Sequence, residues 1–185
     1  MPSVSRATLI ACDPAFVKNL ESWYGELPAE VELASFVDRG LLPASRLLWL
    51  MRFHPDGRKM CAQCAVNIAL AAIGVTKIPK DHTTWEVLEV ASKYDRGVAT
   101  WAALDAAIRA SYADPSADTW GAADAMYHLA EAARAFARAA RATTAADASD
   151  AAQGALAEAL YAVPEDQRWR VLDRAEEVCG LVFHT

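Results

Sequence analysis

With 185 residues and a formal net charge of −6, the chain is long enough for one domain with a buried core. Hydrophobic residues make up 54 % of it and charged residues 23 %, which excludes a disordered protein. Nucleic-acid binding depends on an excess of lysine and arginine that this acidic chain lacks, so direct binding to nucleic acid is not expected. An acidic surface suits a basic protein partner instead.

The N-terminal residues show no targeting pattern. MPSVSRATLIACDP lacks the long apolar stretch of a signal peptide, and no window of the chain approaches a membrane span. We therefore expect a cytoplasmic protein without membrane contact, whose four cysteines remain thiols. We expect a single domain over residues 1–185, with a short disordered start at residues 1–5.

Proline, glycine and capping residues divide the chain into segments with helical periodicity. Asp13 and Pro14, for example, provide an N-cap and a first helical residue, and Gly25 ends the helix that they begin. The segment CAQCAVNIALAAI is apolar on almost every side, so we expect residues 61–73 to be buried. The predicted helices cover residues 5–12, 14–24, 28–39, 43–53, 58–73, 83–96, 99–112, 118–141, 147–163 and 165–183.

Alanine dominates the sequence from Ala99 to Leu160. It is the best helix former, and its short side chain lets neighbouring helices pack closely. No stretch shows the period-two alternation of a strand. The sequence therefore predicts an all-α fold, a compact alanine-rich bundle of about eight to ten helices with no sheet, in which the segment Trp120–Arg141 is central.

The strings DRGLLPASRLLWLMRF and CAVNIALAAI, followed by helices rich in alanine, aspartate and tyrosine, are typical of one known family. Over nearly its whole length the chain resembles the Imm-five-like immunity proteins of phages and bacteria. The other matching segments are ATLIACDPAFVKNLESWYG, GAADAMYHLAEAA and RVLDRAEEVCGLVF. The resemblance implies a protein that neutralises a toxin in a bacterial or phage-infected cell and that has no recognised catalytic residue. The family's occurrence in phages also implies an anti-defence role.

Cys61 and Cys64 lie three residues apart, hence on one side of a predicted helix, and His54 is a turn upstream of them. These three are the candidate metal ligands. A zinc site needs a further pair of ligands, and the sequence has no second CxxC or HxxxH motif. Because cysteine is a common buried helix residue, we predict core thiols and no metal.

His128 follows Asp124 by four residues, so the two side chains share one side of a predicted helix. Such a pair could orient an imidazole for base chemistry. No serine or cysteine stands at a recognisable spacing from it, and we therefore interpret it as a pair on the helix surface. The sequence predicts no catalytic residue and no cofactor.

Two sets of charged residues are the candidate partner-binding sites. Arg134, Arg138 and Arg141 recur at helical spacing and form a predicted basic ridge, which is either a grip for an acidic group or a solvated surface. Glu176 and Glu177 lie near the end of the last helix, where negative charge opposes the helix dipole. The six tryptophans are predicted core anchors, and any exposed one becomes a candidate interface residue.

These observations favour a non-enzymatic cytoplasmic inhibitor that binds a toxin, nuclease or defence effector protein. An anti-defence inhibitor encoded by a phage, for example of the anti-CRISPR type, is the nearest alternative and shares the same physics. A small-ligand or metal-binding helical protein and a self-assembling phage accessory protein, which would form a homo-oligomer, stay open as well.

Overall fold

The computed structural model describes residues 2–38, 42–76, 78, 80, 83–112 and 122–183. They form ten α-helices and one two-stranded sheet, which confirms the predicted all-α class. The helices are α1 (Arg6–Cys12), α2 (Pro14–Tyr24), α3 (Ala34–Asp38), α4 (Ala44–Leu50), α5 (Gly57–Thr76), α6 (Thr83–Asp95), α7 (Trp101–Tyr112), α8 (Ala122–Arg141), α9 (Ala145–Ala162) and α10 (Arg168–Phe183). Two short 3-10 helices, η1 (Met51–Phe53) and η3 (Glu165–Gln167), precede α5 and α10.

The predicted cap Asp13 and the predicted terminating glycine Gly25 lie at the two ends of α2, where the sequence placed them, and a threonine caps α9. The Asp13 carboxylate accepts a hydrogen bond of 2.9 Å from the backbone N–H of Phe16 and caps α2. Gly25 ends this helix with φ at 82°, a conformation that favours glycine. Thr144 caps α9 by accepting a bond of 3.1 Å from the N–H of Asp147.

The one departure from the predicted class is a small antiparallel sheet near the N-terminus. Strand β1 (Ser3–Ser5) pairs with β2 (Glu30–Glu32), so the expected disorder at residues 3–5 and the expected helix from residue 28 are both wrong. The β-branched residues Val4 and Val31 face each other in the register and are both buried. The alternation of EVE is a strand pattern, but it is too short to stand out from the sequence alone.

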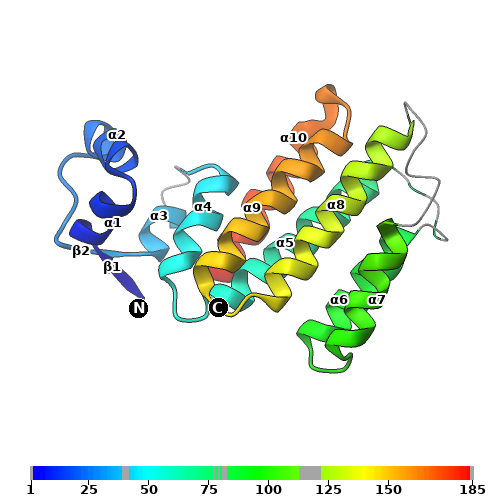
Figure 1. Ribbon diagram of the computed structural model, residues 1–185. Coiled ribbons are helices and arrows are strands. Elements are labelled where there is room, and N and C mark those ends of the chain that lie inside the picture. Colours follow the sequence, from blue (N-terminus) through cyan, green and yellow to red (C-terminus); the bar gives the residue numbers. More distant parts are fainter. Residues whose placement is uncertain are drawn as a thin grey trace.

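The core lies around α5, which packs against α8, α9 and α10 (Figure 1). The sheet, α1 and α2 lie at one end of the molecule, and α6 and α7 lie at the other. Helices α8 and α9 run side by side over a shared surface of small side chains, which lets their axes approach closely. The buried alanines of this surface include Ala132, Ala135, Ala139, Ala148, Ala152, Ala155 and Ala159. Trp120 lies outside the described residues.

Helix α5 corrects one prediction about membranes. The described residues include one helix, Gly57–Thr76, that is long and apolar enough to cross a membrane. Its most apolar stretch of 18 residues has a mean hydropathy of 1.4. Half of that window is buried inside the bundle, because the helix is covered from several sides. Most of the predicted buried segment is indeed buried, whereas Gln63 and Leu70 are exposed.

Candidate functional site

The outer side of α10 carries Glu176 and Glu177, one of the two predicted partner-binding sets. Val171, Ala175 and Val178 point inward and are buried, which leaves the opposite side of the helix uncovered. We call this side the α10 face, and its exposed residues are Trp169, Arg170, Asp173, Arg174, Glu176, Glu177 and Leu181. The indole of Trp169 is 59 % exposed and the side chain of Leu181 is 58 % exposed. The face therefore carries two large apolar groups, three carboxylates and two arginines.

The two exposed arginines of α10, Arg170 and Arg174, each contact a neighbour on the same helix. Arg174 donates to a Glu177 carboxylate oxygen at 2.6 Å, and the guanidinium of Arg170 lies 5.5 Å from the ring centroid of Trp169. Asp173 and Glu176 form no ion pair with any residue that the structure describes. Beside a large aromatic ring, the α10 face therefore presents two carboxylates that form no ion pair with an arginine of the described ranges.

Arg134 contradicts the predicted basic ridge. Its side chain is only 2 % exposed, and its guanidinium donates to the hydroxyl of Ser111 at 2.9 Å and to the Ser111 carbonyl at 2.7 Å. The same group pairs with Glu131 at 2.5 Å. A guanidinium satisfied in this way is a structural clamp between α7 and α8, and it is not accessible to a partner.

Arg138 and Arg141 are exposed and lie beside an open hollow of about 580 Å³ between the end of α8 and the start of α9. Asp147 and Asp150 line the same hollow, so positive and negative charges are mixed there. Arg138 lies 3.9 Å from Glu131, and the guanidinium of Arg141 stacks 4.1 Å from the ring centroid of Trp101. This arrangement fits the solvated-surface interpretation better than an anion site.

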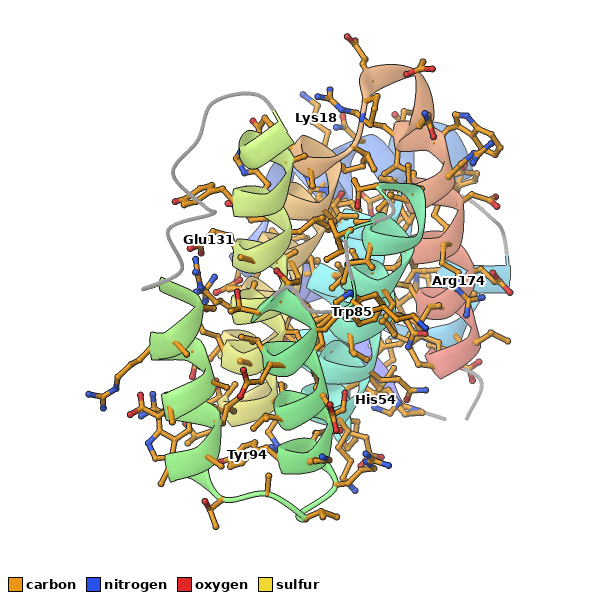
Figure 2. The ribbon with its side chains drawn as sticks, turned by 90° about the vertical axis from the view of Figure 1, so that its right-hand side faces the viewer. Lys18, His54, Trp85, Tyr94, Glu131 and Arg174 are labelled. Carbon is orange, nitrogen blue, oxygen red and sulfur yellow. The ribbon has the colours of Figure 1, made fainter. Side chains whose placement is uncertain are left out.

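The structure does not bring the two predicted charged sets together. Figure 2 shows Glu131, the partner of Arg134, and Arg174 of α10 on opposite sides of the bundle. The arginines of α8 and the glutamates of α10 therefore belong to different surfaces. Only the glutamates lie next to an exposed tryptophan.

The candidate metal ligands occupy the core. Cys61 and Cys64 are fully buried, as is Cys179 of α10, which is hydrogen-bonded to Cys64. Burial raises the pKa of Cys61 to about 12, and the Cys179 bond and burial raise the pKa of Cys64. Within the described part of the chain, no three histidine, cysteine, aspartate or glutamate side chains form a group that could hold a metal ion.

His54 belongs to the turn before α5. Its Nδ1 accepts a hydrogen bond of 3.0 Å from the backbone N–H of Asp56, and its ring packs edge-on against Phe183 at 6.3 Å between centroids. Burial lowers its pKa. These contacts give His54 a role in joining the turn to the C-terminal helix.

His128 has a carboxylate partner other than the predicted one. Its Nδ1 lies 2.7 Å from a Glu158 oxygen of α9, and its ring stacks on Tyr161 at 5.3 Å between centroids. The side chain of Asp124 lies outside the described residues. The histidine thus links α8 to α9, which are the two helices that share the alanine surface.

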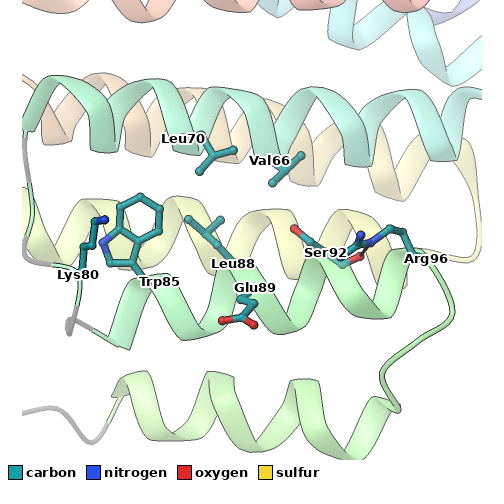
Figure 3. Close-up of a pocket in the computed structure, with 8 residues that line it drawn as sticks. All are labelled: Val66, Leu70, Lys80, Trp85, Leu88, Glu89, Ser92 and Arg96. Atoms are coloured by element: carbon teal, nitrogen blue, oxygen red, sulfur yellow. Dashed lines mark hydrogen bonds between the residues drawn. The ribbon is translucent and has the colours of Figure 1, made fainter.

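A pocket that the sequence did not reveal lies between α5 and α6 (Figure 3). Its volume is about 470 Å³, within the range of small-molecule sites. Val66 and Leu70 line it from α5, Leu88 lines it from α6, and polar groups come from Lys80, Trp85 and Arg96. These residues come from two consecutive helices and from positions near the ends of α6, and they match no motif, so only the packing of the two helices could reveal them.

Trp169 is exposed on the α10 face, whereas the sequence predicted a core residue. A local signal existed, because Trp169 lies out of phase with the apolar positions Val171, Ala175 and Val178 on a helix of 3.6 residues per turn. Trp23 is also exposed, at 68 %, although it follows the buried Leu20 by one turn of α2.

The chain matches no protein-family model, and no curated protein or solved structure matches it. The resemblance to the immunity proteins therefore stays a prediction from the sequence.

Proposed function

We propose that this protein is a non-enzymatic, cytoplasmic binding protein of the immunity type, which neutralises a toxin or effector protein by covering part of its surface. The observation that carries this proposal is the α10 face, where the exposed indole of Trp169 lies on the same helix side as Asp173, Glu176 and Glu177. Tryptophan is among the residues that contribute most to binding energy at protein interfaces.

The carboxylates of the α10 face indicate that the proposed partner has a basic surface. A toxin such as a nuclease must carry basic groups to hold its own nucleic-acid substrate. Unneutralised carboxylates at Asp173 and Glu176, on a chain of net charge −6, would attract such a surface and speed association. The apolar ends at Trp169 and Leu181 would supply the buried contact area, and the acidic centre would select for basic partners.

The same face would serve an anti-defence inhibitor, which differs only in its target. The identity of the captured protein separates the two roles. A toxin encoded beside this chain supports immunity, and a subunit of a host defence complex supports the anti-defence role.

The test is capture of a partner by the tagged protein from lysates of its natural host, with and without phage infection, read by mass spectrometry. We expect one stoichiometric basic protein. Trp169→Ala should weaken its affinity, measured by calorimetry with the purified pair, by about 2 kcal/mol or roughly thirtyfold. The double variant Glu176→Lys and Glu177→Lys should slow association, most strongly at low salt.

Trp23→Ala is the matched control, because Trp23 is an equally large and exposed indole on a different helix. It should leave the affinity unchanged. Equal losses in Trp169→Ala and Trp23→Ala would contradict a role for the α10 face. A blank capture that persists after mild cross-linking would contradict the binding function, and light scattering would then test for self-assembly.

A further inference from the structure

The pocket between α5 and α6 has an apolar floor and polar groups at its two ends. Val66, Leu70 and Leu88 form the floor. In Figure 3, Lys80 and Trp85 lie at one end of the pocket and Arg96 lies at the other. From Trp85 in α6 to Arg96, the residue that follows this helix, the chain rises roughly 16 Å at 1.5 Å per residue. A pocket of this shape suits an elongated ligand with an apolar body.

At the end of the pocket where Trp85 lies, two hydrogen-bond donors have no acceptor among the described residues. The indole Nε1 of Trp85 is buried and has no hydrogen-bond partner among the residues that the structure describes. Lys80, at the same end, makes no ion pair with any described residue. A buried N–H without an acceptor is unfavourable, so an acceptor brought by a ligand would remove this penalty. Two adjacent donors match the two oxygens of a carboxylate.

The charge of the pocket is opposite to that of the whole protein. Among the described lining residues the one carboxylate, Glu89, is already bound to Lys93 at 2.6 Å, which also lowers the pKa of Glu89. Lys80 and Arg96 therefore leave a positive lining on a chain of net charge −6. Arg96 is exposed and donates to the Ser92 carbonyl at 3.1 Å, whereas the buried orphan donor lies at the Lys80 end. The anionic group of a ligand is thus expected at Lys80 and Trp85.

We propose that the α5–α6 pocket binds a fatty acid, with its carboxylate held by the Lys80 ammonium and the Trp85 indole N–H. The alkyl chain lies on Val66, Leu70 and Leu88 and runs toward Arg96. This site is separate from the α10 face and does not depend on the proposed partner.

The test uses dodecanoate as the probe, kept below its micelle concentration. The six indole N–H signals of the ¹⁵N-labelled protein are recorded by NMR, and the Trp85 signal is identified by its loss in Trp85→Phe. We expect this signal alone to move downfield and to saturate, as a hydrogen bond to a carboxylate requires. Dodecanol, which has the same chain without the charge, should leave it almost unmoved.

Two variants locate the ligand. Lys80→Met should weaken dodecanoate binding about tenfold by removing the ammonium. Leu70→Glu should weaken it at least as much, because a carboxylate at this exposed floor position repels the ligand, and circular dichroism checks that the variant is folded. Lys59→Met, an exposed lysine of α5 outside the pocket, is the matched control and should bind normally. Equal shifts with dodecanol, an unmoved Trp85 signal, or unchanged affinity in Lys80→Met would each overturn the proposal.

Discussion

Gly57 is the residue at which the packing leaves least room for a side chain. A Cβ at this position would lie 1.9 Å from the Met51 carbonyl oxygen and 3.1 Å from the Cβ of Ala145. The backbone cannot easily move away, since the Gly57 N–H donates to the His54 carbonyl at 2.9 Å. The first residue of α5 is thus fixed by the turn before it.

We predict that Gly57→Ala lowers the free energy of unfolding by at least about 2 kcal/mol, because the new methyl group overlaps backbone atoms. Urea denaturation followed by circular dichroism measures this change. Gly154→Ala is the control, because its Cβ would meet only the Cβ of Ala135 at an ordinary 4.0 Å. That variant should gain up to about 1 kcal/mol from helix propensity. Equal destabilisation of both variants would show that the close contact at Gly57 is not decisive.

At the scale of elements, Arg134 joins α8 to the end of α7. Its guanidinium holds both the hydroxyl and the carbonyl of Ser111, which is itself only 1 % exposed, and it pairs with Glu131 on its own helix. A charged group in this environment is costly to leave without its partners. The clamp thus ties the position of α7 to that of α8.

We predict that Arg134→Met destabilises the protein by about 3 kcal/mol, because Glu131 is left partly buried without its closest cation. Thermal unfolding measures the loss, and hydrogen exchange should show faster opening of α7 than of α9. Arg138→Met, which removes a half-exposed arginine 3.9 Å from the same Glu131, should cost no more than about 0.5 kcal/mol. Similar losses in the two variants would assign the effect to charge alone and would contradict the clamp.

At the scale of the whole molecule, buried cysteine side chains pack where α5 contacts α10. Cys61, Cys64 and Cys179 are fully buried, and Cys61 also lies 3.7 Å from the sulfur of Met51. These soft side chains fill the core where the central helix meets the C-terminal helix. Cys12 is the exposed cysteine.

We predict that a disulfide reagent at pH 8 modifies one thiol rapidly in the native protein and four after denaturation. The thiolate is the reactive form. Burial blocks access to the core thiols, and the raised pKa values of Cys61 and Cys64 keep these two protonated. Absorbance at the wavelength of the released thiolate counts the reacted groups. Cys12→Ser should abolish the rapid phase, whereas two or more rapid thiols in that variant would contradict a closed core.

The sequence predicted much of the fold because helix ends are local. Asp13 caps α2 through a bond to a residue only three positions away, and Gly25 ends it through its own backbone conformation. The strand Glu30–Glu32 was missed because its hydrogen-bond partner, Ser3–Ser5, lies far away in the sequence. The candidate site was predicted only in part. Glu176 and Glu177 are exposed as expected, but Arg134 is not.

The sequence by itself therefore determined the all-helical class, the main helix boundaries and the acidic charge, since these depend on neighbouring residues and on composition. The tertiary structure decided which side chains meet the solvent. It buried Arg134 against Ser111, exposed Trp169, and placed Trp85 and Lys80 at one end of a pocket with Leu70. The physical reason is that burial is set by the helices packed against a residue, and those helices come from distant parts of the chain.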